Sequence, residues 1–428
     1  MKRYMRYKDS GVNWIGEIPE YWGCVQLRRV SKAILTGGTP KQVSEEHFAE
    51  NGLCWFTPSD FGEEYYLSDS EKHLSYKGET QVKVFPPNCI LMICIGGTMG
   101  KVALATIECS SNQQINAIIT NDFINERYLL FYLKSLRHDI FKTTKYTTLP
   151  ILNQLGTKEI PTILPPLPEQ RHIVTYLDAK VTLIDRYISK REEEIARLKE
   201  WKQALISKAV TKGLDPNAKM KDSGIAWIGE VPEKWGITTM RAITHIVSDK
   251  NHPQEQLLSV VREEGVIIRN VESKEENHNY IPDDLSGYKL VKEGQFVINK
   301  MKAWQGSYAV SSYQGIVSPA YYIFNLRVDD KEFFNYAIRS RSYIPFFTQY
   351  SKGIRVGQWD LSIESFKNIP FFLPPLPEQH TIVRYIEEKT TKADKLISKL
   401  SLQVDYLKEY KQRLISDVVT GKINVQPE

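Results

Sequence analysis

The chain contains two copies of the same pair of sequence blocks, in the same order. Residues 8–23 (KDSGVNWIGEIPEYWG) and 221–236 (KDSGIAWIGEVPEKWG) are identical at 12 of 16 positions, at an offset of 213 residues. Residues 164–190 and 373–399 both begin LPPLPEQ and are identical at 16 of 27 positions, at an offset of 209. Two blocks repeated in one order indicate an internal duplication, so we expect a fold built from two similar halves.

Between these blocks the two halves diverge. Residues 24–160 and 237–369 have similar lengths but share no obvious run of sequence. Each is long enough to form one domain. The expected organisation is a first domain over 1–163, a helix over 164–212, a second domain over 213–372, and a second helix with a tail over 373–428.

The LPPLPEQ block predicts the start of a long helix in each half. Pro168 suits the first helical position, because the N–H that proline lacks would have no partner there. No glycine or proline then follows until Gly213, and in the second half none follows Pro377 until Gly421. Glycine is favoured just after a helix end, so each helix should run for about 44 residues and about 65 Å.

Both predicted helices carry a heptad repeat. The seam positions are Val174, Val181, Ile188, Ile195, Lys202 and Ala209 with Leu177, Ile184, Arg191, Leu198 and Leu205, then Val383, Thr390, Ile397, Val404, Lys411 and Val418 with Ile386, Ala393, Leu400, Leu407 and Leu414. Most are apolar over six heptads, which predicts a coiled coil between the two helices. The alternative is two separate amphipathic helices, each packed on its own domain.

The variable segments have the patterns of a mixed α/β fold. Residues 89–95, 102–107 and 321–328 are strand-like, whereas 126–141 have helical spacing. The repeated tryptophans are expected to pack at a domain edge; they are Trp14, Trp22, Trp227 and Trp235.

Composition restricts the class of protein. The longest apolar run, Cys89 to Ile95, is far shorter than the roughly 20 residues that span a bilayer. The basic N-terminus is not followed by an apolar stretch, so we expect no secretory signal and a cytoplasmic protein. Five cysteines without a CxxC pair argue against a disulfide framework or a structural zinc site and favour a reducing compartment. The net charge of +5 permits a polyanionic partner without requiring one.

No catalytic pattern is present. The GGTMGK run at 96–101 differs from a phosphate-binding loop, because three residues separate Gly96 from Gly100 where four are needed, and Val102 follows the lysine. The motifs of amino-methyltransferases and of metal-dependent nucleases are missing, and the eight histidines have no metal-ligand spacing. The sequence therefore predicts a chain with no catalytic residue, no metal ligand and no bound cofactor.

Polar, glycine-rich segments are the remaining candidates for ligand binding. Lysine and arginine beside glycine can approach phosphates, and asparagine and glutamine can pair with adenine edges. The candidate DNA-binding residues are Thr36, Gly37, Gly38, Thr39, Lys41, Gly97, Thr98, Lys101, Asn112, Gln113 and Gln114 in the first half, and Lys300, Lys302, Gln305, Lys352, Arg355 and Gln358 in the second. For each loop the alternative is an ordinary turn that needs glycine for its backbone.

The duplicated SGxxWIGExPExW motif and the two PLPEQ helices resemble the specificity subunit of type I restriction-modification enzymes. The resemblance covers essentially the whole chain, including GGTP (37–40) and GxxGK (97–101) in the first half and NKMKAWQGS (299–307) and GIVSPAYYIF (315–324) in the second. It implies two α/β target recognition domains, each binding one half of a bipartite, asymmetric site in double-stranded DNA. It further implies an antiparallel coiled coil that separates these domains and serves as a spacer and docking surface.

The same resemblance implies partners and cofactors. Two modification subunits would transfer methyl groups from S-adenosylmethionine to adenine, and restriction subunits would translocate and cut DNA with ATP and Mg²⁺. The chain itself would be a subunit without an active site. Two alternatives remain at this stage, namely a tandem protein-interaction scaffold without a DNA role and a self-contained nuclease or methyltransferase.

Overall fold

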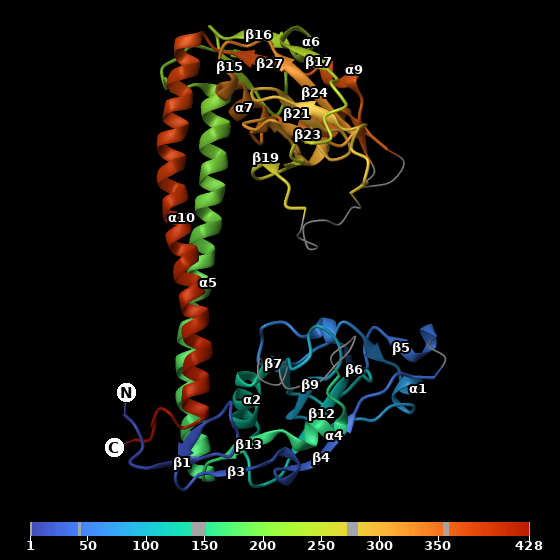
Figure 1. Ribbon diagram of the computed structural model, residues 1–428, viewed down its shortest axis with the longest axis vertical. Helices are drawn as coiled ribbons and strands as arrows, with labels where there is room; N and C mark the ends of the chain where they lie inside the picture. The colour runs from blue at the N-terminus through green and yellow to red at the C-terminus, as the bar shows by residue number, and fades with distance from the viewer. Residues whose placement is uncertain (1, 42–43, 138–150, 272–280, 354–358, 428) are drawn as a thin grey trace. The chain divides into compact units, whose positions relative to one another are not determined.

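The computed structural model describes residues 2–41, 44–137, 151–271, 281–353 and 359–427. The chain forms two compact units. Unit 1 comprises residues 1–191 and 402–428, and unit 2 comprises residues 192–401. The helices α5 (Leu167–Lys212) and α10 (Leu376–Val419) each contribute one part to each unit (Figure 1).

The repeated blocks build the same frame in both units. In unit 1, β1 (Tyr7–Asp9) pairs with β2 (Glu17–Pro19), and β3 (Gly23–Gln26) pairs with β13 (Pro161–Leu164). In unit 2, β14 (Met220–Asp222) pairs with β15 (Glu230–Pro232), and β16 (Gly236–Thr239) pairs with β27 (Pro370–Leu373). All four pairings are antiparallel, and β13 and β27 lead directly into the long helices.

The variable segment of unit 1 contains two sheets. The first has the order β4-β12-β9-β10-β7, formed by β4 (Ser31–Thr36), β7 (Tyr66–Leu67), β9 (Cys89–Ile93), β10 (Val102–Ala105) and β12 (Ile115–Thr120). The second has the order β11-β6-β8-β5, formed by β5 (Phe48–Ala49), β6 (Leu53–Phe56), β8 (His73–Leu74) and β11 (Cys109–Ser111). Among its described residues the segment also contains the helices α1 (Tyr76–Glu79), α2 (Glu126–Ser135) and α4 (Gln154–Glu159).

The variable segment of unit 2 repeats the main sheet. Its order is β17-β24-β21-β22, from β17 (Thr244–Val247), β21 (Phe296–Asn299), β22 (Tyr308–Val310) and β24 (Tyr321–Leu326). In chain order these strands occupy the same sheet positions as β4, β9, β10 and β12, and the three pairings among these four strands are antiparallel in both units. The fifth strand of the unit 1 sheet, β7, pairs with β10 in parallel. The two divergent segments therefore share a sheet topology that their sequences do not reveal.

The rest of unit 2 consists of short pairs and helices. The two-stranded pairs are β18 (Leu258–Val261) with β19 (Gly265–Ile268), β20 (Lys289–Val291) with β23 (Gly315–Val317), and β25 (Ser351–Lys352) with β26 (Asp360–Leu361). The helices are α6 (Met240–Ile243), α7 (Lys331–Arg339), α8 (Ile344–Tyr350) and α9 (Ile363–Lys367).

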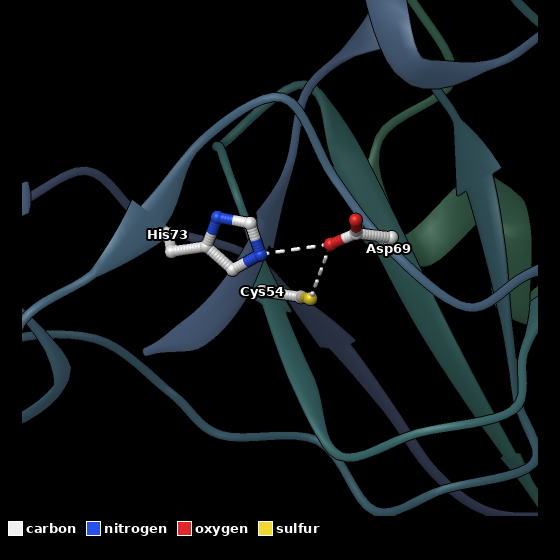
Figure 2. A group of neighbouring side chains, drawn as sticks. All are labelled: Cys54, Asp69 and His73. Carbon is white, nitrogen blue, oxygen red and sulfur yellow. Dashed lines mark hydrogen bonds and ion pairs between the residues drawn. The ribbon is translucent and has the colours of Figure 1, made fainter. Parts of the chain in front are cut away.

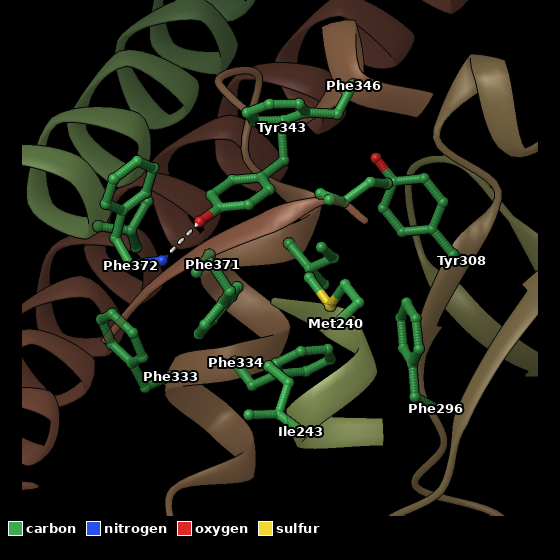
Figure 3. Packing of buried hydrophobic residues seen from close by; sticks show 14 of the residues in the cluster. Met240, Ile243, Phe296, Tyr308, Phe333, Phe334, Tyr343, Phe346, Phe371 and Phe372 are labelled. Carbon is green, nitrogen blue, oxygen red and sulfur yellow. Dashed lines mark hydrogen bonds between the residues drawn. The ribbon is translucent and has the colours of Figure 1, made fainter. Parts of the chain in front are cut away.

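An aromatic core holds unit 2 together (Figure 3). The rings of Tyr308 and Phe347 stack with centroids 3.9 Å apart, and Phe296 packs edge-on against Phe334 at 5.1 Å. The Tyr343 hydroxyl accepts a hydrogen bond from the backbone N–H of Phe372 at 3.2 Å, which ties β27 to this core. Burying rings of this size dominates the hydrophobic stabilisation of a domain.

The long helices confirm the predicted heptad register. In unit 1, His172 of α5 hydrogen-bonds Gln426, beyond the end of α10, whereas Asp185 pairs with Lys411. Moving forward along α5 therefore means moving backward along α10, so the helices are antiparallel. Each predicted seam position is buried or half-buried in both helices, which supports pairing of the two copies over separate packing.

The helix ends and strands also match the sequence pattern closely. Gly213 and Gly421 follow the two long helices with φ of 70° and 75°, the left-handed conformation expected of glycine after a helix. The strands predicted at 89–95, 102–107 and 321–328 are β9, β10 and β24. The helix predicted over 126–141 is shorter, because α2 ends at Ser135 with Leu136 as its C-cap; residues 138–141 lie outside the described residues.

Candidate nucleic-acid interface

Three of the predicted segments of unit 1 meet at one end of its main sheet. Since β4 and β9 both run antiparallel to β12, the ends of β4 and β9 lie beside the start of β12. Backbone hydrogen bonds close the contact, from Gly38 N–H to Ser111 at 2.8 Å and from Cys94 N–H to Gln114 at 2.7 Å. We call residues 36–39, 94–101 and 111–114 the first loop edge.

Side chains link these loops further. Thr36 donates to Asn116 at 2.8 Å, and Thr39 donates to Gln113 at 2.6 Å. The Asn112 amide donates to Gln114 at 3.0 Å, and Asn112 itself is 9% exposed, so it holds the loop rather than faces solvent. Lys41, Gly97 and Gln113 are exposed, whereas Thr98 and Lys101 are half-buried.

Gly37 is required by close packing at this edge. A Cβ atom on Gly37 would lie 2.3 Å from the Asn112 carbonyl oxygen and 2.3 Å from the Ser111 hydroxyl. At Gly38 a Cβ atom would meet nothing within 4 Å. The two adjacent glycines of the TGGTPK segment therefore differ, because one permits backbone contact and the other leaves open space.

Unit 2 presents an equivalent arrangement. The loop 299–307 connects β21 to β22, as the loop 94–101 connects β9 to β10. Lys300 forms an ion pair with Asp360 at 3.0 Å, and the Lys300 carbonyl accepts the Leu361 N–H at 3.1 Å. Because β25 pairs with β26, Lys352 lies opposite Asp360. We call residues 299–307 with β25 and β26 the second loop edge.

The lysines of the second loop edge differ in whether a carboxylate already neutralises their charge. The hydrogen bond from Lys300 to Asp360 raises the pKa of that lysine, which is already compensated by the carboxylate. Lys302, Gln305 and Lys352 are exposed. Arg355 and Gln358, both predicted DNA-binding residues, lie outside the described residues.

In both units the repeated blocks are joined by hydrogen bonds to a glutamate at the start of the long helix. In unit 1, the carboxylate of Glu169 is buried and accepts hydrogen bonds from Tyr4 at 2.6 Å and from the Trp22 indole at 3.0 Å. In unit 2, Trp235 donates to Glu378 at 3.1 Å. Trp22 and Trp235 are the packing residues that the sequence predicts. Trp14 and Trp227 are 40% and 45% exposed, although the Trp227 ring packs edge-on against Phe346.

The long helices also carry exposed aromatic residues. In unit 2, Trp201 and Tyr385 line a groove of about 400 Å³ together with Leu205, Lys208 and Leu214. In unit 1, burial is the main cause that raises the pKa of Tyr176, and the nearby Tyr410 raises it further. Trp201 and Tyr410, and likewise Tyr176 and Tyr385, are separated by the repeat offset of 209. The duplication thus places two related aromatic patches on the helices.

The described residues include no helix long and apolar enough to cross a membrane. The fold is shared with a solved chain from a study of complex assembly and conformational transition of the type I R-M system. That match has a TM-score of 0.68 at 15% identity and covers 95% of this chain and 99% of the solved chain.

Sequence comparisons agree with this likeness. The MjaVIII type I restriction enzyme specificity subunit of Methanocaldococcus jannaschii is 24% identical, over 96% of this chain and 94% of that protein. The EcoDI specificity subunit of Escherichia coli is 20% identical over 72% of both chains. Residues 19–197 match the family model described as the type I restriction modification DNA specificity domain. Residues 19–197 thus match this DNA specificity domain, and the chain is similar, along nearly its whole length, to a specificity subunit of a type I restriction enzyme.

Proposed function

We propose that this chain selects the DNA sequence on which a type I restriction-modification complex acts, with each loop edge binding one half of a bipartite site. The observation that carries this proposal is the equivalence of the two loop edges. In both units a sheet of the same four-strand topology, formed by segments of unrelated sequence, carries exposed basic and amide side chains on neighbouring loops and short strands. A duplicated scaffold with divergent loops suits the recognition of two different half-sites.

The exposed residues divide by role. Lys41, Lys302 and Lys352 are suited to phosphates, because a flexible ammonium group adds charge without reading a base. Gln113 and Gln305 are exposed amides that can pair with adenine edges. Asn112 and Lys300 act indirectly, by holding the loops.

The interaction with DNA is testable through its salt dependence. We expect Lys302→Gln to weaken binding to all sequences about equally and to lower the slope of log K against log salt by roughly one. Lys399→Gln, on an exposed face of α10, is the matched control. If the complex does not bind duplex DNA in a salt-dependent way, the alternative, a protein-interaction scaffold without a DNA role, is favoured.

The assignment of one half-site to each unit can be tested by exchanging a variable segment between relatives. Replacing residues 24–160 with the equivalent segment of a relative should change one half of the methylated motif in the host and leave the other half unchanged. A change in both halves, or in neither, would contradict recognition of one half-site by each unit.

The partners and the chemistry follow from the same assignment. We expect two modification subunits to bind S-adenosylmethionine and restriction subunits to bind ATP and Mg²⁺, with this chain binding neither and working in the cytoplasm. The two aromatic patches suit two copies of one partner, because Trp201 and Tyr410 are duplicates and are 44% and 45% exposed. Trp201→Ser or Tyr410→Ser alone should remove one modification subunit, and the double variant should remove both, as measured by native mass spectrometry. Tyr76→Ser, at an exposed position on α1 and not on α5 or α10, is the control.

The helices are expected to act as a spacer between the half-sites. One heptad inserted after Ile188 and another after Ile397 keeps the seam in register and lengthens the helices by about 10 Å. At about 3.4 Å per base pair this corresponds to roughly three additional base pairs between unchanged half-sites. Methylation retained only at the original spacing would exclude the spacer role.

A further inference from the structure

Cys54, Asp69 and His73 gather their polar atoms at one point of the second sheet of unit 1 (Figure 2). Cys54 on β6 and His73 on β8 are direct partners across an antiparallel pair, so their side chains lie on the same face. The Asp69 carboxylate lies between them, 2.8 Å from His73 Nε2 and 3.7 Å from Cys54 Sγ. All three atoms are within 4.8 Å of one another.

The arrangement does not suit nucleophilic catalysis by the cysteine. A nucleophilic cysteine needs the imidazole beside its sulfur and the carboxylate behind the imidazole. Here the carboxylate contacts both groups, which is the wrong order. Burial, the largest cause, also raises the pKa of the Cys54 thiol, which disfavours a free thiolate.

The same atoms fit the coordination of zinc. Zinc takes thiolate, imidazole and carboxylate ligands at about 2.0–2.3 Å in a tetrahedral arrangement, which separates the ligand atoms by roughly 3.3–3.6 Å. The contact between Sγ and the carboxylate is already close to this value. The contact between Nε2 and the carboxylate must open by about half an ångström, and the Asp69 side chain is 77% exposed and therefore able to move.

We propose that Cys54, Asp69 and His73 bind one Zn²⁺ ion, with water in the fourth position. On binding, the Cys54 thiol loses its proton to solvent, and the neutral imidazole of His73 donates the Nε2 lone pair to the metal. The His73 side chain is 20% exposed, which gives the ion a route to the site, whereas Cys54 anchors it from the core.

The position of this site connects it to the first loop edge. Beyond Cys54 on β6, the Trp55 indole donates to the Gly38 carbonyl at 3.0 Å, and the Phe56 carbonyl accepts the Asn112 N–H at 3.0 Å. Cross-linking β6 to β8 would therefore stiffen the strand that holds two of the three loops of that edge. This step rests on the proposed function, since it makes recognition of the first half-site dependent on the metal.

The direct test is metal binding by the full chain. After removal of metals with a chelator, the chain should bind one equivalent of Co²⁺, with the near-ultraviolet charge-transfer band of a cobalt thiolate, and Zn²⁺ should displace the cobalt. Cys54→Ser and His73→Gln should each weaken binding by roughly 100-fold or more, since each removes one of three ligands. Cys24→Ser, at a half-buried cysteine on β3, should bind as wild type does.

The proposal fails if the folded wild-type chain binds no stoichiometric Co²⁺ or Zn²⁺. It also fails if both ligand variants bind as tightly as wild type, or if the cobalt complex lacks the thiolate band. The His73→Gln variant is expected to fold, because the His73 side chain lies at the edge of the core. The circular dichroism spectrum of this variant should match that of wild type.

A second arm separates this site from the proposed function. In the complex with modification subunits, His73→Gln should weaken recognition of the first half-site only, measured as methylation of DNA with the correct first half-site. Discrimination against base changes in the second half-site should stay as in wild type. If the chain binds zinc but its complex recognises no DNA sequence, the metal site stands and the proposed function is excluded. DNA recognition unaffected by loss of bound zinc would remove the proposed link to the first loop edge.

Discussion

The Trp22 indole donates a hydrogen bond to the buried carboxylate of Glu169 at 3.0 Å, joining the first repeated block to the second. This contact explains why the two blocks recur together in the duplication. The tryptophan of one block supplies the donor that the glutamate of the other requires, and Trp235 with Glu378 repeats the contact. A buried carboxylate needs such partners, because leaving a buried acceptor unpaired costs about 1–3 kcal/mol or more.

Trp22→Phe should accordingly lower the stability of unit 1. The phenyl ring fills much of the space but offers no donor to Glu169, so the expected loss in the free energy of unfolding is about 1–3 kcal/mol. Differential scanning calorimetry measures it. Trp14→Phe, at a residue 40% exposed, should change stability by less than about 0.5 kcal/mol. Equal effects of the two substitutions would contradict the assigned role of the hydrogen bond.

Two lysine–aspartate pairs link the long helices, each with its lysine at a seam position, and they are copies of each other. Lys411 pairs with Asp185 at 2.6 Å in unit 1, and Lys202 pairs with Asp394 in unit 2. Lys202 and Lys411, and likewise Asp185 and Asp394, are 209 residues apart. Lysines paired with aspartates in a mostly apolar seam favour one register, because a shifted alignment leaves them unpaired.

Reversing one pair tests this role. Lys411→Asp should lower the stability of unit 1 by about 1–3 kcal/mol, because the new carboxylate faces Asp185 in a mostly buried position. Adding Asp185→Lys should restore much of the loss, which thermal melting would show. Lys399→Asp, on an exposed face of the same helix, is the control. If the double variant is no more stable than Lys411→Asp alone, the pair does not set the register.

Lys134 should make the stability of unit 1 depend on pH. Burial, the main cause, lowers the pKa of Lys134 to about 8, although its ammonium group lies 3.9 Å from the Tyr65 ring and donates to two carbonyls. Between pH 8 and about 10.4 the unfolded chain binds the proton more strongly than the folded chain, so stability rises with pH in this window.

Lys134→Met keeps the apolar stem and removes the charge. Urea midpoints at pH 7.5 and 9.5 should rise more for wild type than for this variant. The comparison between the two chains cancels groups that titrate in both. Identical pH dependence of the two chains would show that Lys134 keeps an ordinary pKa.

Much of the frame could be predicted from the sequence because it is duplicated and periodic. The seam of α5 and α10 followed from heptad spacing, and the helix ends followed from Pro168, Gly213 and Gly421. The matching sheets of the variable segments could not be predicted, because β9 and β21 share no sequence and their equivalence depends on non-local strand pairing.

The candidate sites, too, could be predicted only in part from the sequence. Glycine-rich composition identified the loops. It could not predict the contact between residues 36–39 and 111–114, because that contact depends on the antiparallel pairing of β4 with β12. The group of Cys54, Asp69 and His73 was missed, because its spacing matches no metal-ligand motif and Cys54 joins it only through the register of β6 with β8. The four-residue step from Asp69 to His73 was the one local signal.

The contact between the two loops can be tested with the adjacent glycines of TGGTPK. Gly37→Ala places a methyl group 2.3 Å from the backbone oxygen of Asn112, so the loops must separate, at a cost of about 1–3 kcal/mol. Gly38→Ala meets no atom within 4 Å and should change stability by less than about 0.5 kcal/mol. Neither glycine has a positive φ, so alanine adds no backbone strain at either position. Thermal melting gives the stabilities, and methylation mapping in the host should show loss of the first half-site with Gly37→Ala while discrimination at the second is kept. Equal stability of the two variants would mean that the loops at the first loop edge are not packed together.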